Sequence, residues 1–529
     1  MSRGEIYAAL RAALRDAAVR VRARRTSALA PVHELGVSAG GWARAAGTAK
    51  AQGWRLASLW AEERGRSLLL TAIVENLGVY GALRTRARMS APSLPSIALV
   101  YPLADRLERH ARDLFGIEFD GHPDPRRWTR HQAWGAQEHP LRASFPAARH
   151  AVEGMTAPDA GYPFRAAQGA GVYEIPVGPV HAGIIEPGHF RFQAVGEEVL
   201  GLEERLGYVH KGIEKIAAGR DPAALARLAA RISGDSPVAH GWAACMAVER
   251  AAGTEPPSRA LRLRAVLAEV ERVTNHLWDI AAVCNDVAFA FVYYQFGRVV
   301  EDWRRVNAEV FGHRLLMDTV VPGGVARDLS PGAAERIVAQ CESTRRELTE
   351  IWGIAQENAS LHDRLAAAGV LAPEDAKALG CVGYVGRASG QDFDVRRDAP
   401  YAPYDTVEIL APSFEHGDVA ARVRVRHDEI LVSLELIRRL LETLPDGAVR
   451  IDIQTPSAGA EGIGIVDGWR GEVVTYVRFA ANGRVGRFFP RDPSWTTWPA
   501  LERLIHGNIV PDFPVCNKSI NGSYSGHDL

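Results

Sequence analysis

The sequence predicts an α+β protein, in which a small N-terminal α/β domain with an antiparallel sheet is fused to a mainly α-helical domain with small peripheral β elements. Short runs of β-forming residues near the N-terminus and long amphipathic patterns in the second half predict this class. The composition agrees, because 529 residues that are 47% hydrophobic and 24% charged can form two or three full cores.

The N-terminal part contains three runs typical of a small antiparallel sheet, at residues 54–63, 66–75 and 78–88. Residues 95–128 then predict a strand, a helix with leucines on one face and a turn rich in Pro and Gly. The first 25 residues have an Ala/Arg amphipathic pattern, interrupted by Glu5 and Asp16, which predicts a solvated helix. We place this domain at residues 1–145 and a linker rich in Gly, Pro and Ala at 146–172.

The second domain, residues 173–529, is dominated by helix patterns. Apolar residues repeat at helical spacing over 202–219, 261–312 and 417–445, as in Leu263, Val266, Leu267 and Val270. Residues 471–493 predict a hairpin that turns at Asn482 and Gly483.

Charge, cysteine content and hydropathy exclude several classes of function. The net charge of -1 gives no basic field for nucleic acid, so no nucleic-acid partner is expected. The five cysteines are scattered, which argues against a disulfide framework and against a Cys-only metal cluster. No run approaches the roughly 18 apolar residues that span a bilayer, and the N-terminus has no signal-peptide pattern. We therefore expect a cytoplasmic protein whose only link to a membrane is through partners.

Motifs along most of the chain resemble two subunits of respiratory complex I. Residues 108–128 (ERHARDLFGIEFDGHPDPRRW) and 138–146 (EHPLRASFP) resemble its 30 kDa subunit. Its 49 kDa subunit is matched in order at 178–192, 202–215, 261–277, 321–328, 385–405, 417–429 and 467–472. The fusion of both parts resembles still more closely the large subunit of membrane-bound group 4 [NiFe] hydrogenases of the formate hydrogenlyase type. The resemblance implies a hydrogenase-large-subunit-like helical domain, an iron–sulfur small subunit as partner, membrane subunits, and a place on the inner face of the cytoplasmic membrane.

The hydrogenase resemblance also implies a metal site whose ligands are missing here. In the hydrogenases, the motif R-I-C-G-x-C and a C-terminal C-x-x-C supply four thiolates to nickel and iron. In this chain Ser233, Ser236, Ser523 and Gly526 stand at those positions. A serine hydroxyl is neither ionised at neutral pH nor soft enough to replace a bridging thiolate. We expect no [NiFe] centre and no other cofactor on this chain, with the iron–sulfur cluster in the small subunit.

The side chains that contact quinone in complex I are also missing from this chain. At the positions where that family presents a His and a Tyr to the quinone, this chain has Pro187 and Gly234, which donate no side-chain hydrogen bond. The resemblance leaves Glu186, Arg387 and Arg470 as candidates for a cavity or a proton relay, with Glu186 as a buried carboxylate. The alternative readings are a Glu186 paired with a neighbouring arginine and an Arg470 in a structural ion pair.

Two further groups of residues complete the candidates. A set that could converge near the old metal site, and bind zinc or another ion through N and O ligands, comprises His181, His189, Asp235, His240 and His527. Lone histidines are more often core residues satisfied by hydrogen bonds, which is the favoured alternative. Packing salt bridges are expected for Asp392, Asp394, Arg396 and Arg397.

Two hypotheses of function follow. The first is a redox subunit that passes electrons from an iron–sulfur partner to an unidentified acceptor, with quinone as one candidate. The second is a non-catalytic scaffold or coupling subunit of the same kind of complex. An active [NiFe] hydrogenase is a third, weaker reading because of the missing thiols. An open, polar cavity would favour the first hypothesis, and a collapsed apolar one the second.

Overall fold

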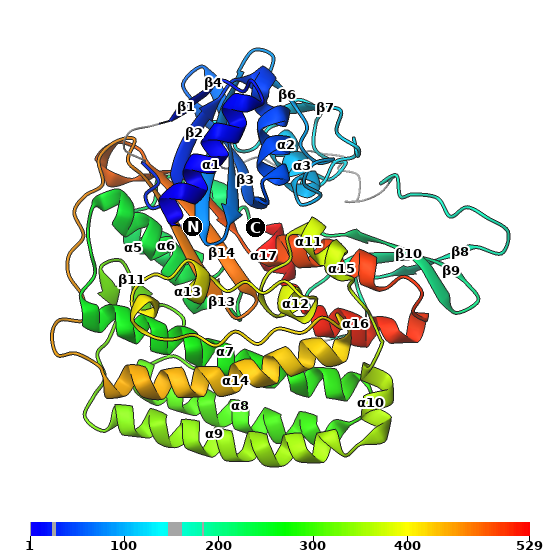
Figure 1. The fold of residues 1–529 in the computed structure, drawn as a ribbon, viewed down its shortest axis with the longest axis vertical. Helices are drawn as coiled ribbons and strands as arrows, with labels where there is room; N and C mark the ends of the chain where they lie inside the picture. Colours follow the sequence, from blue (N-terminus) through cyan, green and yellow to red (C-terminus); the bar gives the residue numbers. More distant parts are fainter. Residues whose placement is uncertain (1, 24–27, 147–160, 182, 184) are drawn as a thin grey trace.

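The structure is a computed structural model that describes residues 2–23, 28–146, 161–181, 183 and 185–529 (Figure 1). Much of the predicted linker, residues 147–160, lies outside the described residues. The α+β class is confirmed, because sheets at the N-terminus are followed by a mainly helical second half.

The N-terminal sheet has the strand order β1-β2-β5-β4-β3. The three predicted runs form β3 (Arg55–Arg64), β4 (Ser67–Asn76) and β5 (Val79–Arg88), which pair antiparallel as expected. One pairing differs, since β2 (His33–Val37) lies parallel to β5. The elements around this sheet are α1 (Arg3–Asp16), β1 (Val21–Ala23), α2 (Trp42–Ala51), β6 (Ser93–Pro95), α3 (Ala104–Phe115) and β7 (Glu118–Asp120).

Two local expectations in this region were wrong. The N-terminal helix ends at Asp16, and it buries Ile6, Leu10 and Leu14 rather than being solvated all round. The predicted strand over residues 96–101 is a turn, and the short strand β6 precedes it.

Four long helices form the opposite end of the molecule and lie side by side in Figure 1. They are α7 (Ser258–Asp286), α8 (Ala290–Phe311), α9 (Ala333–Gln356) and α14 (Val419–Glu442). The predicted helical run 261–312 therefore breaks between α7 and α8. The side chain of Asp418 caps α14 by accepting a hydrogen bond from the backbone N–H of Ala421 (2.7 Å).

A three-stranded antiparallel sheet lies between these helices and the N-terminal sheet (Figure 1). It consists of β13 (Glu461–Gly468), β14 (Gly471–Phe479) and β15 (Val485–Arg491). The turn before β15 has Asn482 and Gly483 at positive φ, which confirms the predicted hairpin. Helix α6 (Pro237–Ala252) packs on β13 and β14.

The helix predicted at 202–219 was wrong in its first part, where the chain forms a strand of a third sheet. Residues 198–205 form β10 (Glu198–Arg205), which pairs with β9 (His189–Val195), and β9 pairs with β8 (Tyr173–Val177).

The remaining α-helices and β-strands are α4 (Ile213–Ala217), α5 (Pro222–Ala229), β11 (Val320–Val321), β12 (Gly324–Val325), α10 (Ala359–Leu365), α11 (Pro373–Leu379), α12 (Gly383–Ala388), α13 (Val395–Asp398), α15 (Ser494–Leu504), α16 (Phe513–Ile520) and α17 (Tyr524–Asp528). No helix within the described ranges combines the length and apolar character needed to cross a bilayer.

Candidate functional site

The serine turn, residues 233–237, connects α5 to α6 and faces the C-terminus of the chain. Pro237 occupies the first turn of α6, and the backbone N–H of Ser236 donates to the carbonyl of Ser233 (3.1 Å). The hydroxyls of Ser233 and Ser523 lie 2.7 Å apart, although 290 positions separate them in the sequence. Ser523 caps α17 by accepting a hydrogen bond from the backbone N–H of Gly526 (2.9 Å). The fold therefore brings the predicted positions together.

An ion pair between Arg470 and Asp235 lies beside these serine hydroxyls. Arg470, in the turn between β13 and β14, donates from Nη1 and Nη2 to the two carboxylate oxygens of Asp235 at 2.7 and 2.6 Å. Both Ser233 and Ser236 donate to Oδ1 of the same carboxylate. Burial alone would raise the pKa of Asp235, but the charge and hydrogen bonds of Arg470 lower it below its usual range. The expected alternative for Arg470, a structural ion pair, is thus present, and the pair lines a cavity.

That cavity has a volume of about 400 Å³ and many polar walls. Its lining includes Ser233, Gly234, Asp235, Glu271, Asn275, Asp279, Arg470, Lys518, Asn521, Ser523 and Ser525. A second cavity of about 450 Å³ shares Ile185, Trp278, Ala282 and Lys518 with it. The walls of this second cavity are largely apolar and include Val177, Phe190, Tyr293, Phe513 and Pro514.

Glu186 lines the polar cavity, but it is not the buried carboxylate that we expected. It is exposed, and its Oε2 accepts a hydrogen bond from the backbone N–H of Ser525 (2.9 Å). Pro187, the next residue, is half-buried, whereas Gly234 lies in the cavity wall.

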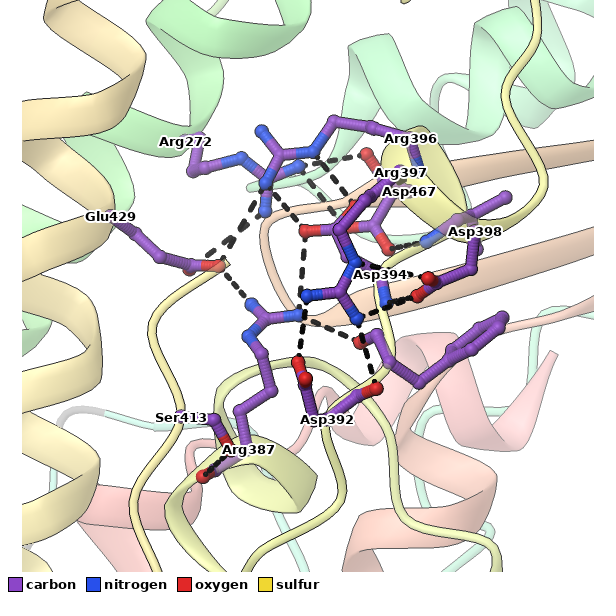
Figure 2. Close-up of polar contacts among 12 residues, drawn as sticks. Arg272, Arg387, Asp392, Asp394, Arg396, Arg397, Asp398, Ser413, Glu429 and Asp467 are labelled. Atoms are coloured by element: carbon purple, nitrogen blue, oxygen red, sulfur yellow. Dashed lines mark hydrogen bonds and ion pairs between the residues drawn. The ribbon is translucent and has the colours of Figure 1, made fainter. Parts of the chain in front are cut away.

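Arg387 was wrongly expected at the cavity, because it does not line it and belongs instead to a buried ion cluster (Figure 2). Its guanidinium contacts the carboxylates of Glu429 and Asp394. Arg272 joins the cluster and donates to the backbone carbonyls of Asp467 and Gly468 at 3.0 Å each. Because those residues directly precede Trp469 and Arg470, the cluster fixes the position of the turn between β13 and β14 that carries Arg470. The expected packing role is seen for two further buried ion pairs, Asp394–Arg396 and Glu269–Arg396, whereas the Asp392–Arg397 pair lies at the surface, with Asp392 58% exposed.

The five proposed metal-binding side chains do not gather at one point. His240 pairs with Asp492 (2.7 Å), and His527 stacks on Trp495 with a ring separation of 4.3 Å. His189 bonds to the carbonyl of Gly178, and His181 accepts from the backbone N–H of Gly183. Over the ranges that the structure describes, no group of three or more His, Cys, Asp or Glu side chains is placed to hold a metal ion.

The residues present do not fit a [NiFe] centre. The three serine hydroxyls are neutral, hard donors already bonded to each other or to Asp235. A Cβ atom at Gly526 would lie 2.7 Å from the carboxylate of Asp492, so even a cysteine would require that side chain to move. No cysteine lines the cavity, and burial raises the pKa of Cys516, the cysteine nearest in sequence to Ser523, to about 12.

Comparison with known families agrees with the motif resemblance. Residues 45–151 match the family described as respiratory-chain NADH dehydrogenase, 30 Kd subunit, and residues 287–461 match the family described as respiratory-chain NADH dehydrogenase, 49 Kd subunit. Residues 211–280 match nickel-dependent hydrogenase. The chain is 33% identical over 350 residues to the carbon monoxide-induced hydrogenase of Rhodospirillum rubrum, covering 66% of this chain and 97% of that protein. The chain belongs to this hydrogenase and complex I large-subunit family.

Two more relatives in this family extend the comparison. Formate hydrogenlyase subunit 5 of Escherichia coli K12 is 30% identical over 448 residues, covering 84% of this chain and 79% of the relative. A chain in the structure of the membrane-bound sulfane sulfur reductase, an archaeal respiratory membrane complex, superposes with a TM-score of 0.64 at 26% identity. That match covers 68% of this chain and 98% of the other.

Two buried carboxylates of the site were missed by the sequence analysis. Asp492 holds His240 and lies against Gly526, and Glu271 lines the cavity from α7. The signal for Glu271 was its place on the apolar face of α7, where an unpaired acid is unusual. Asp492 follows a strand and gave no such signal.

Proposed function

We propose that this chain is the acceptor-reducing subunit of a membrane-bound oxidoreductase related to complex I, and that it works without nickel. Electrons come from an iron–sulfur cluster in a small partner subunit and reach an acceptor in the polar cavity. The observation that carries the proposal is this cavity, which remains open and polar at the position where the thiolate ligands are missing.

Several features support a redox role over a scaffold role. A scaffold subunit would be under no constraint to keep Arg470, Asp235 and three serine hydroxyls arranged around a cavity of about 400 Å³. The missing thiolates are the one feature that favours the scaffold hypothesis. They are equally explained by an acceptor that needs no metal.

The acceptor differs among the named relatives, so the family alone does not identify it. Relatives are named as hydrogenases and as a sulfane sulfur reductase. In this chain, the apolar cavity beside the polar one provides room for the tail of an amphiphilic acceptor, which keeps quinone as a candidate. With Pro187 and Gly234 at the usual positions, its head group would have to be bound by other groups, such as the serine hydroxyls and Lys518.

Partners and location follow from the same proposal. The small iron–sulfur subunit and the membrane subunits hold the chain at the inner face of the cytoplasmic membrane, as a peripheral subunit. The relatives support this, since one is a numbered subunit and another is part of a respiratory membrane complex.

The first experiment is metal analysis of the chain purified with its small subunit, combined with an H2-oxidation assay. We expect iron in the partner, no nickel and no H2 oxidation. Stoichiometric nickel with activity would refute the nickel-free proposal.

The second experiment blocks the cavity. Thr274 lines it, and its hydroxyl donates to the carbonyl four residues earlier at 2.9 Å. Thr349 makes the same bond at 2.9 Å on the exposed face of α9, so Thr349→Trp is a matched control for Thr274→Trp. With the iron–sulfur cluster reduced chemically, we expect its reoxidation by a short-chain quinone or by polysulfide to slow at least about tenfold in T274W only. Equal rates in both variants, or no reoxidation by any acceptor in the unaltered complex, would favour the scaffold hypothesis.

A further inference from the structure

Glu271 is a buried acid in the wall of the polar cavity. It is 4% exposed and lies on α7, directly behind the serine turn. Its two carboxylate oxygens accept hydrogen bonds from the backbone N–H groups of Val238 (2.6 Å) and Ala239 (3.1 Å), at the N-terminus of α6. Within the described part of the chain, no arginine, lysine or histidine forms an ion pair with it, unlike Asp235 or Asp279.

Two opposing effects act on this carboxyl group. Burial disfavours its charged form, and the negative charge of Asp235 adds to that effect, whereas the two N–H groups and the positive end of α6 favour the carboxylate. Burial prevails and raises the pKa of Glu271 to about 8. The acid can therefore both lose and regain a proton near neutral pH.

The charged groups around Glu271 come from three elements. Asp235 faces it from the serine turn. Arg272, its neighbour on α7, is directed into the cluster of Figure 2, where it bonds to Asp467 and Gly468. Arg470, from the turn between β13 and β14, donates two hydrogen bonds to the carboxylate of Asp235. Of these groups, Arg272 favours the Glu271 carboxylate through its charge, but this is the weakest of the effects on the pKa of Glu271, and Arg272 forms no ion pair with it within the described residues.

We propose that Glu271 is the proton donor of the cavity, an inference that rests on the proposed function. The acceptor takes two electrons, delivered singly by the iron–sulfur cluster of the partner subunit, and two protons. In each proton transfer the O–H bond of the Glu271 carboxyl breaks and the proton passes to the reduced acceptor. The carboxylate left behind is held by the N–H groups of Val238 and Ala239 until water in the cavity returns a proton. The second transfer repeats the first.

The test uses the complete complex with Glu271→Gln, which keeps one oxygen acceptor, replaces the other oxygen by an amide NH2 and carries no acidic proton. Glu108→Gln is the matched control. Burial also raises the pKa of Glu108 to about 8, and its carboxyl also accepts a backbone N–H bond, but it lies on α3 in the N-terminal part. Glu271→Asp retains an acid and serves as the conservative variant.

Infrared titration measures the acid directly, without turnover. We expect each Gln variant to lose one protonated carboxyl band that titrates near pH 8. Acceptor reduction at neutral pH should fall about 100-fold in E271Q, lose its decline above pH 8, remain unchanged in E108Q, and be partly restored in E271D.

The outcomes separate this inference from the proposed function. Normal reduction by E271Q, or a Glu271 that is fully ionised at pH 7 in the infrared spectrum, would overturn the role of Glu271 and leave the proposed function standing. An unaltered complex that reduces no acceptor, although Glu271 titrates as expected, would instead overturn the proposed function.

Discussion

Asp235 shows how a single pairing decides the charge state of a residue in this cavity. It lies in the same wall as Glu271, and burial acts on both carboxyl groups in the same direction. Only Asp235 has an arginine across from it, so its pKa is lowered while that of Glu271 is raised. Of these two acids in the cavity wall, Asp235 is held in its charged form and Glu271 exchanges protons.

Asp235→Asn should destabilise the protein in a pH-dependent manner. Because the folded-state pKa of Asp235 is lowered, the stability it contributes is present above the unfolded-state value of roughly 4 and is lost as the pH falls further. The side chain is 39% exposed, so solvent screening limits the expected loss to about 1 kcal/mol at pH 7.

Urea denaturation at pH 7 and pH 3 measures this difference. Asp328→Asn, which removes an exposed pair with Arg259, is the control and should leave the midpoint unchanged. A loss in D235N of the same size at both pH values would show that packing, not the ion pair, is responsible.

The sequence predicted the position of the site better than its chemistry. Motif spacing located Ser233, Ser236, Ser523, Gly526 and Arg470, because the turns that carry them are part of the fold. It could not place Arg387 or His240, since their partners Glu429 and Asp492 come from distant segments. Whether a buried charge faces a cavity or another charge depends on tertiary packing, which a single sequence does not state.

At the scale of elements, α6 and β13 are interlocked by small residues. An added Cβ at Gly464 would lie 1.9 Å from the carbonyl oxygen of Ala243, and one at Gly462 would lie 1.9 Å from that of Ala247. This close approach sets the distance between the serine turn at the start of α6 and Arg470 at the end of β13. The Asp235–Arg470 contact therefore depends on two glycines outside the cavity.

Gly464→Ala should push the helix and the strand apart. Overpacking of this kind costs about 3 kcal/mol, and the variant should also lose the acceptor-reducing activity because Arg470 is displaced. Gly47→Ala is the control, since Gly47 lies within α2 with open space around it and should gain about 0.5 kcal/mol. Thermal unfolding measures both, and a G464A variant as stable as the unaltered chain would contradict the interlock.

The incorrect helix prediction at 202–219 also has a physical explanation. Residues 202–219 place Leu202 and Leu206 four apart, which fits a helix, but the backbone of 198–205 pairs with β9 instead. Local periodicity is ambiguous over such short segments, and the available strand partner decides. The long patterns of α7 and α14 were predicted correctly because their apolar faces continue for many turns.

At the scale of the whole molecule, buried ion pairs join the N-terminal sheet to strands β13 and β14 of the second half. Glu472 on β14 accepts hydrogen bonds from Arg55 (2.7 Å) and Tyr80, and it also pairs with Arg491. Arg84 and Arg64 both reach Glu461 on β13. Removing these charges from water is costly unless every partner is in place, so the two parts are expected to unfold together.

Glu472→Gln tests this coupling. Burial alone would raise the pKa of Glu472, but Arg55 and Arg491 lower it to about 2, so its contribution is present above the unfolded-state pKa and lost in acid. The variant leaves Arg491 without its ion-pair partner and Arg55 with Glu75 alone, and it should lose about 3 kcal/mol at neutral pH. Calorimetry should show one transition, shifted to lower temperature. Glu435→Gln on the exposed face of α14 should have little effect, and two separate transitions in the unaltered chain would refute the coupling.

The close approach of Gly526 to Asp492 limits which side chains position 526 can carry. Cysteines introduced at all four positions would still meet the Asp492 carboxylate at position 526, and Asp492 is itself held by His240. Moving it would leave His240 without its partner. Placing four thiols around this cavity would therefore require a rearrangement beyond the four positions themselves, because position 526 accepts a side chain only if the Asp492–His240 pair gives way.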